Sequence, residues 1–203
     1  MPETSPASSH RGRPLRNAVS ICIAVVVAPL AAQDRAIDVG RSTMTVHAGK
    51  AGLFSIAGHE HWISAPLGAG VLNNSDKPHV EFTVRAAGLT VKPDPKVDSK
   101  TQAEIQNTMQ EMVLESARYP EIVFRSSRVE PQAARTWKVE GLLTLHGVTR
   151  PVSAVVTQAG ETYAGRTSIK QTDFGIRPIS VAGGAVKVKN ELDIEFQIVT
   201  RPE

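Results

Sequence analysis

Apolar and polar side chains alternate along two consecutive segments between Trp137 and Thr157, which meet at a Gly147–Pro151 corner. Successive side chains of a β-strand point to opposite faces, so this alternation predicts a pair of half-buried antiparallel strands. The apolar face of the first segment carries Trp137, Val139, Gly141, Leu143 and Leu145. Because half-buried strands need partners, we expect the remaining chain to form more sheet around this pair.

The same alternation recurs at 80–86, 122–126 and 186–198, with an interruption at Asn190 in the last run. About eight strands are predicted in all, since each run is bounded by Gly, Pro or polar turn residues. Closing the sheet into a barrel would remove the unpaired edges of an open meander. The expected fold is all-β with one inserted helix: a lipocalin-like, roughly eight-stranded antiparallel β-barrel, which can hold one small ligand.

One segment has helical rather than strand periodicity. Its apolar stripe consists of Ile105, Met109, Met112 and Val113, the spacing of one helix face. Asp98 or Ser99 can cap its start, and the Tyr119-Pro120 pair stops it. We predict a helix from about Lys100 to Leu114, lying on the sheet or over the mouth of the barrel.

The first 32 residues have the pattern of a secretory signal peptide. A basic region with Arg11, Arg13 and Arg16 precedes an apolar run, and the small residues Ala31 and Ala32 offer a cleavage site. The apolar run is short for a membrane span, although an uncleaved N-terminal anchor is the alternative. We therefore predict a signal peptide at 1–32 and a barrel domain at 33–203, periplasmic or secreted and not membrane-spanning after cleavage.

Charge and cysteine content exclude some classes of protein. The leader holds three Arg and one Glu, which leaves 20 basic and 19 acidic residues in the rest of the chain. That balance leaves no basic stripe for nucleic acid. The one cysteine, Cys22, lies in the leader, so the exported domain is expected to be stabilised by its core without disulfides. A homodimer is left open, because an edge strand or the helix could pair two copies.

Seven apolar residues are predicted to face the barrel interior: Phe82, Val84, Phe124, Trp137, Val139, Leu143 and Leu145. Alternation alone does not separate a filled core from a ligand cavity. Gly141, Ala86 and Ala154 on the same faces would leave room for a ligand. Met109 and Met112 on the helix suit an adaptable cover over such a ligand, because methionine is flexible and polarisable.

The histidines suggest a second kind of site. His59 and His61 are two residues apart on a predicted strand, so both side chains would project from one face. With His47 from a neighbouring strand as third ligand, they could bind Zn²⁺ or Cu²⁺. The simpler interpretation is a solvated polar pair at the barrel mouth, so no metal cofactor is expected.

No catalytic machinery is predicted. His146 stands at a strand end, where its ring could hydrogen-bond the backbone of the Gly147–Arg150 corner. A base without a placed partner is not a mechanism. Asp173 before Phe174-Gly175 is interpreted as a turn, in which glycine permits a positive φ. We therefore expect a binding protein, not an enzyme.

Several motifs occur in a characteristic order: Ala36-Ile37-Asp38, the segment 119–127 beginning Tyr-Pro-Glu-Ile-Val-Phe, the string Leu-Thr-Leu-His-Gly-Val-Thr-Arg-Pro-Val at 143–152, and Asp173-Phe174-Gly175-Ile176. The ordered set resembles the YceI-like family of secreted, lipocalin-like proteins. The chain departs from the family pattern at 99–102, where Ser-Lys-Thr-Gln replaces the usual Arg-Asp-x-His, and at the Gly58-His59-Glu60-His61 stretch.

The resemblance implies an extended eight-stranded barrel in the periplasm, with a polyisoprenoid or similar long-chain lipid in its lumen. It favours a cavity over a filled core, and hence a ligand-binding role for the inward residues and the two methionines. Two alternatives stay open. One is a metal-binding envelope protein that uses His47, His59 and His61. The other is a filled barrel that contacts further envelope proteins.

Overall fold

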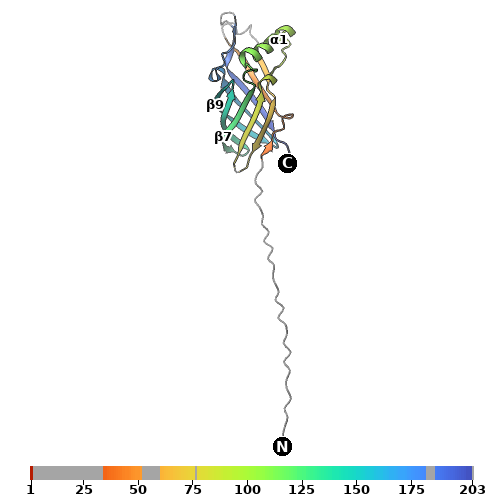
Figure 1. Cartoon of the computed structure of the whole chain (residues 1–203), viewed down its shortest axis with the longest axis vertical. Helices are drawn as coiled ribbons and strands as arrows, with labels where there is room; N and C mark the ends of the chain where they lie inside the picture. The colour runs from red at the N-terminus through yellow and green to blue at the C-terminus, as the bar shows by residue number, and fades with distance from the viewer. Residues whose placement is uncertain (2–33, 52–59, 76, 182–185, 203) are drawn as a thin grey trace. The chain divides into compact units, whose positions relative to one another are not determined.

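The computed structural model of the chain describes residues 1, 34–51, 60–75, 77–181 and 186–202. Apart from Met1, the predicted signal peptide lies outside these residues. Within them, the strands form a single antiparallel sheet that curls around an interior, with one helix at its upper end in Figure 1. The expectation of an all-β, lipocalin-like barrel with one inserted helix is confirmed.

The elements follow each other in a simple order. The strands are β1 (Arg35–Ala36), β2 (Thr43–Ala51), β3 (His61–Ser64), β4 (Leu67–Asn73), β5 (His79–Arg85), β6 (Thr90–Val91), β7 (Glu121–Ala133), β8 (Thr136–Leu145), β9 (Val148–Ala159), β10 (Thr162–Lys170), β11 (Ser180–Val181) and β12 (Val186–Val199). The helical segments are η2 (Ala86–Gly88), α1 (Ser99–Thr108), η3 (Met109–Val113) and η4 (Gln171–Phe174).

The described residues contain twelve strands, more than the eight expected. Three of the twelve, β1, β6 and β11, are two residues long, too short to show periodicity in the sequence. The sheet order is β1-β4-β5-β7-β8-β9-β10-β12-β2-β3-β6, with β11 paired to β12. The predicted pair at 137–157 is observed as β8 and β9, in unbroken register from Thr136↔Thr157 to Leu145↔Val148.

The segment after β1 closes the lower end of the sheet. Ile37 N donates to Gly70 O of β4 at 2.9 Å, and Asp38 N donates to Val199 O of β12 at 2.8 Å. Two strands that are far apart in the sheet order are thereby joined through one short segment. Backbone groups that an open sheet would leave unpaired are satisfied there.

Helix α1 covers the opposite, upper edge, where β6 ends the sheet. The Asp98 side chain caps it by accepting from Lys100 N and Thr101 N, so Asp98 rather than Ser99 is the cap. Gln106 Oε1 accepts from Val91 N at 2.8 Å and its Nε2 donates to Leu89 O at 3.0 Å. The helix therefore supplies hydrogen-bond partners that the edge of β6 would otherwise take from water.

A short ion pair fixes the chain just after the helix. His146 Nε2 lies 3.0 Å from Glu115 Oε1, and the Tyr119 ring lies tilted against the imidazole with 4.4 Å between centroids. The predicted bond from the His146 ring to its own corner is not observed; its Nε2 pairs with Glu115 instead. The hydrogen bond to His146, followed by that to Arg118, lowers the pKa of Glu115.

Two glycines admit aromatic rings against the sheet. A Cβ added at Gly141 would lie 2.5 Å from Phe124 Cζ, and one at Gly165 would lie 2.6 Å from Phe196 Cζ. The expectation that Gly141 leaves room for a ligand is wrong, because the Phe124 ring already covers it.

Substituting Gly141 with alanine should therefore lower the free energy of unfolding by about 1–3 kcal/mol, the usual cost of overpacking. Gly68→Ala is the matched control, because its added Cβ would meet only Thr83, no closer than 3.4 Å. Urea unfolding of both variants measures the difference. Equal stabilities would contradict this account of Gly141.

A second prediction concerns acid stability. Because the folded-state pKa of Glu115 is depressed, its contribution is present above the unfolded pKa and is lost as the pH falls through the folded value. Glu115→Gln should therefore flatten the loss of stability in the acid range, whereas Glu111→Gln, on an exposed position nearby, should leave it unchanged. Thermal unfolding at a series of acidic pH values makes the comparison, and parallel curves for wild type and Glu115→Gln would refute it.

Candidate functional site

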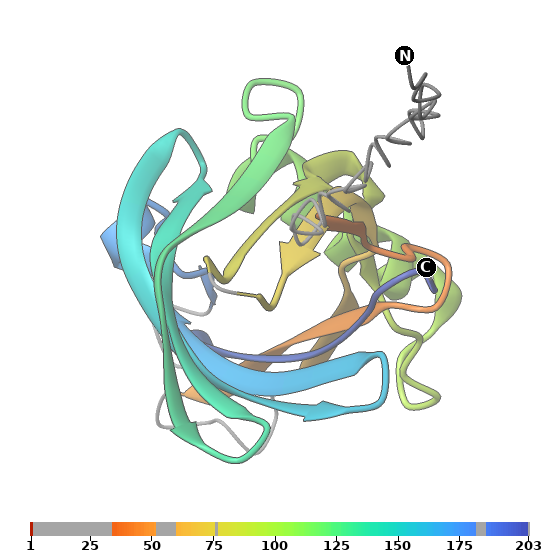
Figure 2. The same cartoon turned by 90° about the horizontal axis from the view of Figure 1, so that it is seen from below.

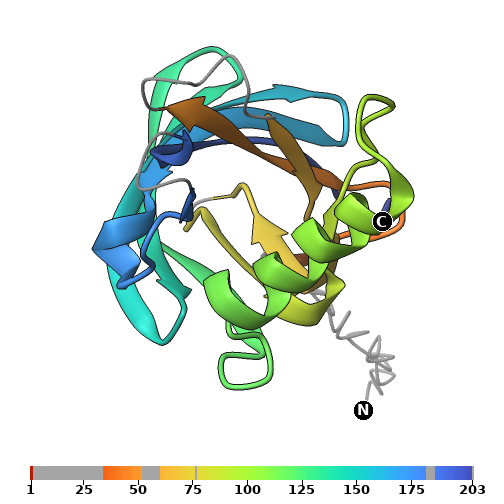
Figure 3. The same cartoon turned by 90° about the horizontal axis from the view of Figure 1, so that it is seen from above.

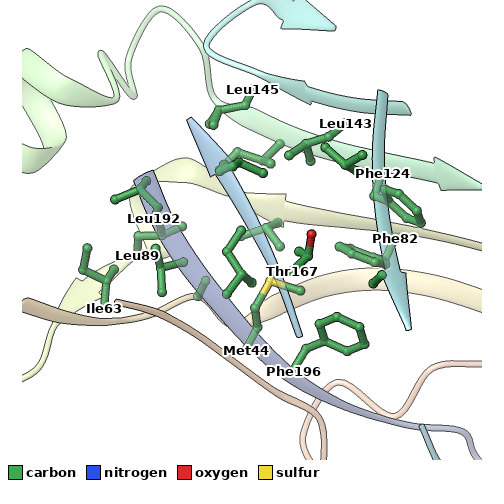
Figure 4. Close-up of a pocket in the computed structure, with 18 of the residues that line it drawn as sticks. Met44, Ile63, Phe82, Leu89, Phe124, Leu143, Leu145, Thr167, Leu192 and Phe196 are labelled. Atoms are coloured by element: carbon green, nitrogen blue, oxygen red, sulfur yellow. The ribbon is translucent and has the colours of Figure 1, made fainter. Parts of the chain in front are cut away.

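The inner face of the curled sheet encloses a cavity of about 520 Å³. Aliphatic and aromatic side chains from the strands dominate its lining, and Figure 4 draws 18 of the lining residues and labels ten of them. Phe82 and Phe124, on neighbouring strands β5 and β7, lie with their ring centroids 5.3 Å apart. A cavity of this volume is within the range of small-molecule sites in proteins, so the interior is not a filled core.

Most of the residues predicted to contact a ligand lie at this cavity. They are Phe82, Val84, Met109, Phe124, Trp137, Val139, Leu143 and Leu145. The strand residues among them come from β5, β7 and β8, where period-two alternation gave the correct face. Met109 comes from the end of the helical segment and is buried.

Met112 is the exception, because it is 68% exposed and does not line the cavity. After Thr108 the α-helix widens into the π-helical turn η3, in which Leu114 N donates to Met109 O five residues back. The wider turn rotates Met112 outward and brings Leu114 onto the cavity instead. The spacing that predicted Met112 assumed a regular α-helix.

Further lining residues were not predicted as ligand contacts. Those on β2, β3 and β12 include Met44, Val46, Ile63, Leu192, Ile194 and Phe196. The alternation of β12 was visible in the sequence, so its inward face could have been included. Strand β3 is only four residues long, and the sequence carries a weaker signal there.

The two ends of the cavity differ in chemistry. The upper end lies against α1, which Figure 3 shows from above. Thr101, Glu104 and Ile105 of this helix line the cavity. At the lower end, Asn74 Nδ2 donates to the Tyr163 hydroxyl at 2.8 Å. Burial raises the pKa of the Tyr163 phenol, so its hydroxyl stays protonated and uncharged.

The predicted metal site does not form from the two described histidines. Strand pairing places His47 opposite Trp62, whose ring stacks on the imidazole at 4.4 Å. His61 lies opposite Ala48 and lines the cavity, so His47 and His61 are on opposite faces of the sheet. His59 lies outside the described residues. Among described residues, no group of three or more His, Cys, Asp or Glu could hold a metal ion.

No helix within the described ranges combines the length and apolar character needed to cross a membrane.

Solved structures of other proteins share this fold. Burkholderia cenocepacia BcnA is 19% identical, with a TM-score of 0.56 over 81% of this chain and 99% of that one. A polyisoprenoid binding domain from Saccharophagus degradans, implicated in plant cell wall breakdown, is 12% identical, with a TM-score of 0.57 over 83% and 98% of the two chains.

A sequence relative is the UPF0312 protein of Pseudomonas savastanoi pv. phaseolicola, which is 34% identical over 98 residues. The match covers 43% of this chain and 49% of the relative, so the chain spans about half the length of the curated relatives that it matches. The YceI-like domain matches residues 36–200, nearly all of the described barrel. The chain belongs to the YceI-like domain family.

Proposed function

We propose that this protein is exported and holds a long-chain apolar ligand, a polyisoprenoid or similar lipid, in the cavity of its barrel as a carrier or store. The observation that carries the proposal is the cavity of about 520 Å³ with its apolar lining. Its few polar groups are gathered mainly at the two ends. A ligand that fits such a lining is apolar along its length.

The energetic basis of binding is the burial of methylene groups, worth about 0.8 kcal/mol each. Several methylenes in contact with Phe82, Leu143 and their neighbours would give tight binding without polar contacts, after the cost of ordering the chain is subtracted. A lining without charged side chains in its middle avoids the penalty of desolvating a charge. No metal or other cofactor is part of the proposal.

Two further observations support this function. The Saccharophagus degradans domain that shares the fold is described as polyisoprenoid binding. The pattern of the first 32 residues favours export through a signal peptide, which would place the barrel in the periplasm or outside the cell. A soluble barrel with a shielded apolar interior is suited to hold a lipid in such an aqueous compartment.

Adjacent residues on β8 provide a matched test. Leu143 lines the cavity, whereas Leu142 points outward and is exposed. Leu143→Asn should weaken the binding of geranylgeraniol at least tenfold, because an amide without partners would face the apolar chain. Leu142→Asn should leave the affinity unchanged. Titration calorimetry on the two folded variants makes the comparison, and equal affinities would count against the cavity as the binding site.

A further inference from the structure

The first residue after β4 is held to β10 at the lower end of the barrel, which Figure 2 shows from below. Asn74 follows β4, and Tyr163 is on β10, and their side chains are joined by a hydrogen bond of 2.8 Å. In the sheet order, β5, β7, β8 and β9 lie between these two strands. At this end, however, Ile37 and Asp38 join β4 to β12, which pairs with β10. The Asn74–Tyr163 hydrogen bond therefore adds a side-chain contact to the end that this backbone segment closes.

A second set of polar contacts, made by Asp34, lies at the same end of the barrel. Asp34 Oδ1 accepts from Asn73 Nδ2 at 3.0 Å and lies 3.2 Å from His79 Nε2. The hydrogen bond from Asn73 lowers the pKa of Asp34. Asn73 and His79, on either side of the β4–β5 connection, thus contact Asp34, while Asn74 is hydrogen-bonded to Tyr163 of β10. These contacts join the N-terminal segment, the β4–β5 connection and β10 at the lower end.

Two aromatic rings lie on the inner side of this closure. Trp137 and Tyr163 both line the cavity, with ring centroids 6.3 Å apart. Tyr163 is only 4% exposed. Together with Asn74, these two residues form what we call the floor. Because the floor is bulky and hydrogen-bonded, a ligand that enters from the helix end cannot pass through it without breaking those contacts.

The depth above the floor can be estimated along β8. Trp137 and Leu145 both face the cavity and are eight residues apart, which is about 26 Å of strand. A strand tilt of about 40° reduces this to a depth of about 20 Å. An extended chain advances about 1.2 Å per single bond, so about 17 bonds fit between floor and mouth.

The volume gives an independent estimate. A methylene group takes up roughly the volume that one water has in the liquid, about 30 Å³. The cavity of about 520 Å³ therefore has room for at least about 17 chain carbons. Its volume is thus sufficient for one extended chain that reaches from the mouth to the floor.

We propose that the floor of Asn74, Trp137 and Tyr163 acts as a length stop, so that the barrel encloses about 15–20 carbons of a chain and gains little affinity from any beyond them. In isoprenoid terms, three to four units are enclosed, and the remainder of a longer chain stays beyond the mouth. The inference rests on the proposed lipid-binding function and adds the chain-length class of the ligand. It also assigns the specificity to named residues.

The test is a length series on the purified, delipidated protein. Geranyl, farnesyl, geranylgeranyl and longer polyprenyl monophosphates share one head group, so differences in affinity report on the chain. Each added unit should improve the dissociation constant by about tenfold up to the fourth unit, and by less than about twofold beyond it. Titration calorimetry measures the series.

Two outcomes distinguish a failure of the length stop from a failure of the proposed lipid binding. Affinity that keeps rising with each unit to the longest chain would overturn the length stop but leave lipid binding intact. Failure of every chain to bind would overturn the proposed function together with the length stop. A plateau near four units supports both.

Variants then locate the stop. Trp137→Ala should move the plateau to a chain about one unit longer, because it removes the indole from the floor. Ile105→Ala is the matched control, since Ile105 lines the cavity at the helix end and should leave the plateau where it is. A plateau that moves equally in both variants, or in neither, would contradict the assignment to the floor.

A fluorescence measurement needs no change at the floor. The chain contains two tryptophans, and Trp62→Phe on the outer face leaves Trp137 as the single reporter. Emission should shift when a chain becomes long enough to reach the floor and should stay constant for longer chains. A shift of equal size with the shortest chain would overturn the inference.

Discussion

The burial of one apolar face of a curled antiparallel sheet is the interaction on which the rest of this structure depends. Every long strand presents alternate side chains to the interior, and removal of that surface from water is the main favourable contribution to folding. The same surface cannot close on itself completely, because rings and branched chains from opposite walls leave a space of about 520 Å³. The side chains that stabilise the fold are therefore the same ones that line the proposed ligand site.

The two ends of the barrel solve the problem of unpaired edges in different ways. At the lower end, Ile37 and Asp38 join β4 to β12, and Asn74 ties the loop after β4 to Tyr163. At the upper end, the Gln106 side chain of α1 accepts from Val91 N of β6 and donates to Leu89 O just before that strand. The cavity thus has a hydrogen-bonded floor at one end and a helix at the other, with polar lining residues at both.

Much of the architecture could be predicted because period-two alternation is a direct consequence of strand geometry. It placed Phe82, Trp137 and Leu143 on the inner face correctly. Local alternation does not specify which strands pair or in which register. A shift of one residue exchanges the two faces, which is why His47 and His61 were expected together but lie on opposite sides.

Other features depend on contacts that no short stretch of sequence contains. The π-helical turn that exposes Met112 arises where the helix meets the barrel. The Asn74–Tyr163 hydrogen bond joins residues 89 positions apart. Neither residue is unusual near a turn, so the local sequence does not indicate that they pair. Glu115 was likewise not expected as the partner of His146. Such long-range polar contacts fix the ends of the cavity, so the length of the ligand could not be inferred from the sequence.

Native mass spectrometry of the protein, isolated from its own cells without detergent, tests the central claim most directly. We expect a discrete added mass that corresponds to a single apolar chain, lost when the protein is unfolded. A protein that carries no such mass, and that acquires none when incubated with a lipid extract of the same cells, would contradict the account of the barrel as a lipid carrier.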